Sequence, residues 1–408
     1  MLSKVPFRGF RGNPASRAIG IIFALCGLGF GTWASFIPFV KQTFHLGEAQ
    51  LGLLLLCLPL GNFIANPLTV VLIRRWGAVR IALVAGSLTA FFFAMPVSIP
   101  SLTYAAIGLV LAGGFFGITN VAMNTLASSY ETKTEIKIMS TCHGMWSVGA
   151  MLGSLISGLA ILPISHYFKY GISPQANYVF ALALCILFIT WLIRKDFSFL
   201  IQMQHTQSKQ QKISWRAFKP TRILWMLITI CLCTYLTEGT MADWSAVYLK
   251  EIVLAPETIA GWGFAVYSFC MAAGRFIGDK LIARFGSIPV LRSGGFFVFA
   301  GLIVVILSHN TWIALPGFML VGIGISLASP ILYSSAANVT GLAPGVGLAT
   351  LNTFAMASFF GGPVLIGFIG KMADLRIAFM FVAFASIIWL IQTTRLLRIL
   401  KSSNSQGI

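Results

Sequence analysis

The chain has 408 residues, of which 57% are hydrophobic and only 9% are charged, and its mean hydropathy is +0.88. Soluble chains carry about 25% charged residues, so this composition excludes a soluble globular protein. The formal net charge of +18 would suit a nucleic-acid partner, but the placement of the basic residues excludes that class.

Apolar runs of roughly 20 residues recur along the chain, which is the length a helix needs to cross about 30 Å of hydrocarbon. Twelve such segments are expected, at residues 17–40, 48–73, 80–97, 102–129, 138–162, 176–193, 221–249, 257–280, 288–307, 311–337, 343–370 and 374–396. The sequence therefore predicts an all-α membrane protein with twelve transmembrane helices. The first run is long enough to span and no small-residue cleavage site follows it, so it is expected to be a retained helix and no signal peptide.

Basic residues gather in every second loop. The alternate loops hold only Lys41, Lys169, Lys250, Lys371 and Arg376. The other 23 of the 28 basic residues (28 − 5) lie on one side, which the positive-inside rule makes the cytoplasm. Both termini are then expected in the cytoplasm, and the lipid bilayer explains the charge without nucleic acid.

The seven cysteines all fall within the predicted segments, and their number is odd. A disulfide framework is therefore not expected, and the thiols are interpreted as small buried side chains. The sequence has no zinc-ligand spacing, no phosphate-cradling loop and no nucleophile triad. We expect no metal, no cofactor and no enzyme activity.

An internal repeat with an offset of 209 residues divides the chain. Matched residues are Gly52 with Gly261, Gly77 with Gly286, Gly113 with Gly322, His143 with Asn352, Gly153 with Gly362 and, after two residues of loop difference, Trp33 with Trp244. The repeat predicts a six-helix bundle over residues 1–193, a cytoplasmic linker over 194–220 and a second six-helix bundle over 221–408. A site between two such halves near the midplane is typical of transporters.

The segment GRFIGDKLIARFG, residues 274–286, resembles the loop signature of the major facilitator superfamily. Together, HGMWSVGAMLGSLISG (143–158) and TEGTMADWSAVYL (237–249) look most like the fucose-permease-like branch and uncharacterised bacterial inner-membrane transporters near it. The resemblance covers the whole chain and implies two pseudo-symmetric bundles in the inner membrane. One departure is Val70, which stands in the first half where the second half has Asp279.

The same resemblance implies that Arg275, Asp279 and Arg284 form a gate on the cytoplasmic side. The acid would hold that side closed and release its partner when the carrier turns inward. The alternative is a plain topogenic loop with a surface ion pair, worth about 0–1 kcal/mol.

Glu238 falls slightly past the middle of the seventh segment. Insertion scales assign a central ionised acid a cost of about 2.5–3.5 kcal/mol, so such residues normally face a bundle interior and mark a pathway. Thr234, Glu238, Ala242 and Ser245 form one stripe of small or polar residues at helical spacing. Desolvation disfavours the charged form of a carboxylate, so Glu238 is predicted to be a proton-coupling site. A structural, permanently protonated acid and direct contact with the solute are the alternatives.

Asp243 lies five residues further on, about 140° around the helix, so the two acids do not share a face. It is ranked second as a proton site, behind a structural role at the end of the seventh segment, and it could pair with Lys250. The matched position in the first segment is Thr32, so no acid stands there. The proton mechanism of the fucose permease therefore cannot be carried over residue by residue.

Polar and aromatic residues at helical spacing suggest the lining of a solute site. The candidates are Trp33, Asn62, Asn66, Asn120, Asn124, His143, Ser147, Trp244, Tyr267, Tyr333 and Asn352. Trp33 and Trp244 would flank the site as paired aromatic walls, although ordinary packing is the alternative for each aromatic residue. His143 could relay protons or be a hydrogen-bonded histidine. Neutral amides and aromatic rings favour a hydroxylated or otherwise polar solute over a strongly charged one.

These features favour a monomeric secondary transporter for a small polar organic solute such as a sugar, coupled to protons. The region Gly149 to Gly153 lacks the proline common in superfamily antiporters, which favours uptake over efflux. An efflux antiporter of the same fold is the alternative within transport. A non-transporting solute sensor is the alternative from another class, and the short tails leave little room for its signalling extension.

Overall fold

The computed structural model describes residues 13–98, 100–136, 138–167, 173–194, 221–337, 339 and 346–405. These residues form helices joined by short turns, and they contain no strand, which confirms the predicted all-α class. Of the predicted linker at 194–220, all but Arg194 lies outside the described residues.

The first half of the chain supplies eight described helices. Their bounds are α2 Pro14–Thr43, α3 Glu48–Leu55, α4 Cys57–Trp76, α5 Ala78–Phe92, α6 Met95–Ser98, α7 Leu102–Thr134, α8 Met139–Tyr167 and α9 Pro174–Ile193. Asn13 begins α2 because its side chain accepts a hydrogen bond from the backbone N–H of Ala15, and Pro14 follows at the first helical position.

The second half supplies eight more helices. Their bounds are α11 Arg222–Glu251, α12 Glu257–Ala260, α13 Trp262–Phe285, α14 Ser287–Leu307, α15 Thr311–Ile325, α16 Ala328–Ala337, α17 Val346–Met372 and α18 Leu375–Ser405. Thr221 begins α11, where its hydroxyl accepts from the N–H of Leu224.

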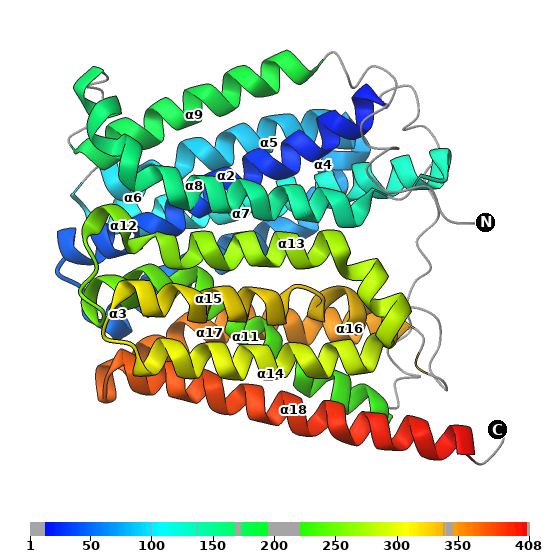
Figure 1. The fold of residues 1–408 in the computed structure, drawn as a ribbon. Coiled ribbons are helices and arrows are strands. Elements are labelled where there is room, and N and C mark those ends of the chain that lie inside the picture. The colour runs from blue at the N-terminus through cyan, green and yellow to red at the C-terminus, as the bar shows by residue number, and fades with distance from the viewer. Residues whose placement is uncertain are drawn as a thin grey trace.

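Ten helices or helix pairs among the described residues are long and apolar enough to cross a membrane. The two remaining predicted segments, 138–162 and 257–280, form α8 and α12–α13. The long helices run side by side, and α2 begins at the same end of the molecule at which α18 ends (Figure 1). We name this the terminal end and the other the distal end.

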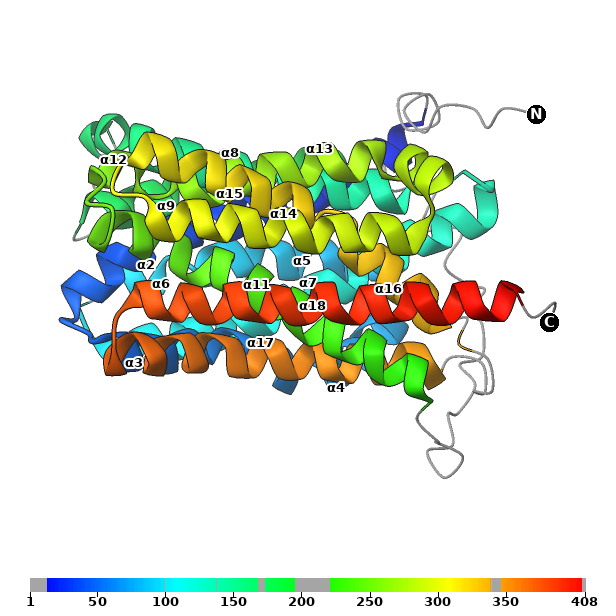
Figure 2. The same ribbon diagram turned by 60° about the horizontal axis from the view of Figure 1, so that its bottom comes forward.

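The helices of each half pack mainly on one another, and the two groups lie against each other along a seam (Figures 1 and 2). In the first half, α2 packs on α8 and α7 packs on α4 and α5; in the second, α14 packs on α15 and α18, and α11 on α17 and α18. Across the seam, α8 packs on α13, α3 on α17 and α2 on α11.

The repeat is visible in the backbone at the ends of α4 and α13. Gly77 and Gly286 follow these helices with φ of 82° and 83°, and their N–H groups donate to the carbonyl oxygens of Ile73 and Ile282. A positive φ is strained for residues with a Cβ. The same glycine therefore ends the equivalent helix in each half, 209 residues apart in the sequence.

The halves come closest near the distal end, where glycines let the backbones touch. A Cβ added to Gly52 of α3 would lie 2.6 Å from the carbonyl oxygen of Pro363, and one added to Gly367 of α17 would lie 2.5 Å from that of Glu48. No side chain fits in either place, so α3 and α17 seal the seam at this end.

Candidate functional site

Glu238 lies near the centre of the 30-residue helix α11 and is half-buried. Its charge interacts with that of Arg275 on α13 and with the hydroxyl groups of Tyr235, Tyr267 and Tyr333. Among the described ion pairs none joins Glu238 directly to Arg275. The acid and the arginine are therefore electrostatic neighbours that form no direct ion pair among the described residues.

Arg275 crosses the seam from α13 to α8. Its Nη1 donates to the carbonyl oxygen of His143 at 3.3 Å and to Oγ of Ser147 at 2.9 Å. Arg275 lies well inside α13, which continues to Phe285. The helix runs past the end of the predicted segment 257–280 and ends only where Gly286 changes the backbone direction.

The other two predicted gating residues lie further along α13. Arg284 is exposed at the end of the helix, with its guanidinium 5.2 Å from the centre of the Phe285 ring. The backbone of Asp279 is helical, but its side chain lies outside the described residues. A gating role for these residues stays a prediction.

His143 heads a chain of hydrogen bonds within the first half. Its Nε2 lies 3.2 Å from Oδ1 of Asn124, and Nδ2 of Asn124 donates at 2.8 Å to both oxygens of Asn120. The His143 ring also meets the Phe23 ring edge to face. The structure thus brings three of the predicted site residues together, on α7 and α8.

The second half carries a similar chain. Tyr235 donates to the hydroxyl of Tyr333 at 3.1 Å, and Tyr333 donates to Oδ1 of Asn352 at 3.2 Å. These residues come from α11, α16 and α17, and Tyr235 stands one turn before Glu238. Sequence reasoning missed Tyr235, although its spacing of three residues from Glu238 was a usable signal.

The three large aromatic candidates are buried in helix packing. Trp33 stacks on Phe93 within the first half, with ring centres 5.8 Å apart. Trp244 and Tyr267 are fully buried, and neither the indole N–H nor the Tyr267 hydroxyl has a hydrogen-bond partner among the described residues. A binding role for Trp33, Trp244 and Tyr267 stays a prediction.

The remaining predicted residues are spread along the helices. The side chain of Asn62 lies against Gly117 of α7, and Asn66 is exposed on α4. Asp243 is half-buried and joins none of the described ion pairs. Its considered partner, Lys250, lies instead 3.9 Å from Glu257, because the turn after α11 brings the first residue of α12 back toward it.

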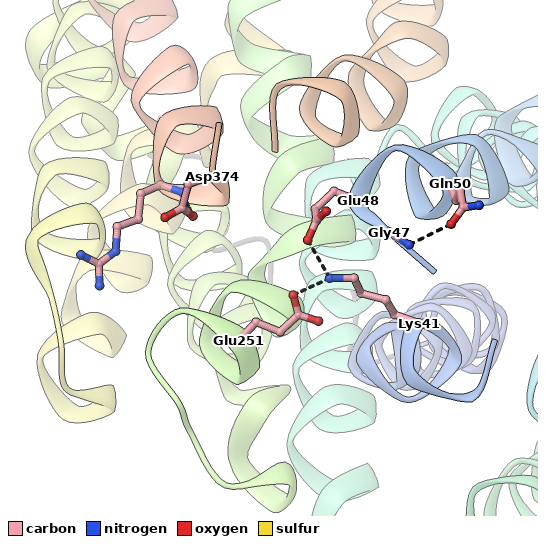
Figure 3. A network of polar contacts seen from close by, with 7 residues as sticks. Lys41, Gly47, Glu48, Gln50, Glu251 and Asp374 are labelled. Carbon is pink, nitrogen blue, oxygen red and sulfur yellow. Dashed lines mark hydrogen bonds and ion pairs between the residues drawn. The ribbon is translucent and has the colours of Figure 1, made fainter. Parts of the chain in front are cut away.

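A charged cluster at the distal end was missed by sequence reasoning. Nζ of Lys41, at the end of α2, lies 3.1 Å from Oε1 of Glu48 on α3 and 2.5 Å from Oε2 of Glu251 at the end of α11 (Figure 3). The Lys41 side chain is only 8% exposed. This cluster, the distal triad, ties the first half to the second. Its only signal in the sequence was a basic residue on the side that the positive-inside rule leaves nearly free of them.

Metal binding has no support in the described part of the chain. No group of three His, Cys, Asp or Glu side chains gathers there. All seven cysteines are free thiols, and Cys185 is exposed whereas five others are buried.

Comparisons with known proteins find a matching family and several similar transporters. Residues 19–254 and 244–406 match the Major Facilitator Superfamily. An uncharacterised MFS-type transporter of Yersinia pestis is 33% identical over 88% of this chain and 90% of its own. An uncharacterised transporter of Sinorhizobium fredii is 32% identical over 91% and 96%, and the membrane protein MosC of Rhizobium meliloti is 25% identical over 94% and 92%.

Solved structures show the same architecture. The nucleoside transporter NupG aligns with a TM-score of 0.69 at 12% identity, over 93% of this chain and 99% of its own. A bacterial homologue of the human lysosomal transporter Spinster, in an inward-facing and unoccupied conformation, aligns with a TM-score of 0.70 at 14% identity, over 93% and 96%. None of these proteins is named as a fucose permease, so that branch stays a prediction. The family match over nearly the whole chain and the full-length transporter relatives show that the chain belongs to the Major Facilitator Superfamily of membrane transporters.

Proposed function

We propose that this protein is a secondary active transporter that moves a small polar organic solute across the bacterial inner membrane by alternating access, coupled to protons through Glu238. The single observation that carries the proposal is the position of Glu238, a half-buried acid near the middle of α11, a helix that packs on α2 of the other half. Such an acid in a membrane span normally marks a pathway.

The proposed topology has twelve spans and cytoplasmic termini. The start of α2 and the end of α18 lie at one end of the molecule (Figure 1), in agreement with an even number of spans. The basic loops put that terminal end in the cytoplasm. The distal end, with Lys41 and Glu251, is then periplasmic.

Glu238 suits proton exchange because it is a half-buried carboxyl group in the middle of a membrane helix, where the access of water decides which protonation state is favoured. A change in the access of water to the seam, or in the distance to Arg275, would therefore shift the proton on or off. Asp243 remains the second candidate, without a described charged neighbour to tune it.

The solute would lie between the polar chains of the two halves. Asn120, Asn124 and His143 are linked within the first half, and Tyr235, Tyr333 and Asn352 within the second, and each chain would contact the solute from its own side. Hydroxyl and amide groups both donate and accept hydrogen bonds, which suits a hydroxylated solute.

The distal triad fits the role of a periplasmic gate. Lys41 binds one acid of its own half and one of the other half, and separation of the halves at this end would break only the second pair. The close contacts of Gly52 and Gly367 support a state closed at this end.

Transport in reconstituted vesicles tests the proposal. We expect a panel of polar solutes to include one that accumulates when a proton gradient is imposed, and Glu238→Gln to reduce its accumulation to the level seen without a gradient. Glu135→Gln is the matched control, because Glu135 is exposed at the end of α7. Gradient-driven accumulation that survives in Glu238→Gln would remove Glu238 from the coupling mechanism.

A further inference from the structure

We propose that Arg275 binds a carboxylate of the transported solute, so that the solute is a small hydroxylated acid and not a neutral sugar. This inference rests on the proposed transport function and names its substrate class. It starts from the position of Arg275, which lies in the middle part of α13 and makes hydrogen bonds across the seam to α8.

Some N–H donors of the Arg275 guanidinium group have no acceptor among the described residues. An arginine carries five N–H donors, and both described bonds, to His143 and Ser147, come from Nη1. Nη2 and Nε make no hydrogen bond to the described residues. Their planar, paired geometry matches the two oxygens of a carboxylate.

The charge of Arg275 also lacks a direct partner among the described side chains. Glu238 interacts with it at a distance and forms no ion pair with it. When Glu238 takes up a proton, the arginine loses even this compensation, and an uncompensated charge inside a membrane protein is unfavourable. A carboxylate on the solute would restore the balance. Protonation of Glu238 and binding of an acid would therefore favour each other, which is the coupling that a symporter of proton and anion requires.

The groups around Arg275 suit a hydroxylated body attached to that carboxylate. The buried Tyr267 hydroxyl has no described partner and is close enough to Arg275 and Glu238 for both charges to act on it. The linked hydroxyls of Tyr235 and Tyr333 lie near Glu238 on the other side. An acid with several hydroxyl groups would use all of these.

A purely structural Arg275, which only ties α13 to α8, is the competing explanation. It predicts that Arg275 variants lose stability but that the protein does not distinguish solutes by charge. The test therefore compares D-gluconate with D-sorbitol, which has the same carbon chain but carries a hydroxymethyl group in place of the carboxylate. The measurement is the thermal unfolding midpoint of the full-length protein in detergent, because a ligand that binds the folded state raises it.

We expect D-gluconate, against potassium chloride of equal ionic strength, to raise the midpoint with saturation, and D-sorbitol to leave it unchanged. Arg275→Gln should lose the response, and Arg275→Lys, which keeps the charge but not the paired donors, should require at least tenfold more gluconate. Arg292→Gln is the control, because Arg292 is exposed on α14. The wild-type comparison stands even if an Arg275 variant fails to fold.

The proposal is overturned if sorbitol stabilises as well as gluconate, if neither stabilises, or if Arg275→Gln keeps the gluconate response. The vesicle assay separates this failure from failure of the proposed function. If a neutral solute is taken up along the gradient and Glu238→Gln abolishes that uptake, the proposed transport function stands and the proposal of an acidic solute fails. If gluconate binds through Arg275 but no solute is taken up along the gradient, the acidic ligand stands and the proposed transport function fails.

Discussion

Lys41 contacts two carboxylates that differ in one respect: Glu48 belongs to its own half of the chain and Glu251 to the other. The lysine is nearly buried, and losing both partners would leave its charge without compensation. In the proposed gate, Glu48 would hold Lys41 in both states. Only the pair with Glu251 would distinguish the closed distal end from the open one.

Removal of Glu251 should therefore open the distal end. We expect Glu251→Gln to shift the equilibrium toward the open state by about 1 kcal/mol, or about fivefold in population. The measurement uses a protein without the native cysteines that carries Ser154→Cys. The rate at which a membrane-impermeant thiol reagent labels this cysteine is compared with and without Glu251→Gln. Ser154 is buried and donates across the seam to the carbonyl oxygen of Gly261 at 2.7 Å.

Glu48→Gln is the matched variant for this experiment. It removes the same charge from the same lysine but leaves the bond between the halves, so the labelling rate should rise much less. Equal labelling in the two variants would show that Lys41 does not act as a gate through Glu251.

At the residue scale, Glu238 stands out in the sequence because an acid in an apolar run is conspicuous whatever the fold, and its role stays a prediction. The sequence could not show the partners of Arg275, because its hydrogen bonds to His143 and Ser147 cross between the halves. The distal triad could not be predicted at all. Lys41 and Glu251 lie 210 residues apart, and only the packing of the two halves brings them together.

At the scale of elements, the glycines that end α4 and α13 make a direct prediction. Any side chain at Gly286 must adopt a φ near 83°, so Gly286→Ala should destabilise the protein by about 1–3 kcal/mol. The denaturation midpoint in detergent is the measurement. Gly361→Ala is the control, because Gly361 lies within α17 with nothing within 4 Å of its added Cβ, and there alanine should be neutral or stabilising.

The expected segments correspond well to helices, but their interruptions were not predicted. Segment 48–73 breaks into α3 and α4, segment 80–97 into α5 and α6, and segment 311–337 into α15 and α16. Hydropathy averages over a window and is blind to a local change of backbone direction within an apolar run. Breaks of this kind depend on the packing of neighbouring helices.

For the whole molecule, the repeat alone predicts two equivalent groups of helices. The recurrence of Gly77 and Gly286 at equivalent helix ends agrees with that prediction. The repeat carries no information about which ends of the two groups touch. That depends on contacts between the halves, such as Gly52 and Gly367, whose partners are distant in the sequence.

A side chain at Gly367 should prevent closure of the distal end. The added Cβ would meet the backbone of Glu48 at 2.5 Å, so Gly367→Val should hold α17 away from α3 and increase labelling of the cysteine at Ser154. Gly361→Val on the same helix should leave labelling unchanged, because no atom lies near its added Cβ. Labelling of Gly367→Val at the wild-type rate would mean that this contact does not limit closure.

The two hydrogen-bonded chains, Asn120–Asn124–His143 and Tyr235–Tyr333–Asn352, each lie wholly inside one half. If the halves rock past one another as rigid blocks, as proposed, both chains would survive intact. The groups proposed to contact the solute could then change without disturbing the movement, and related proteins with the same motion could diverge widely in their cargo.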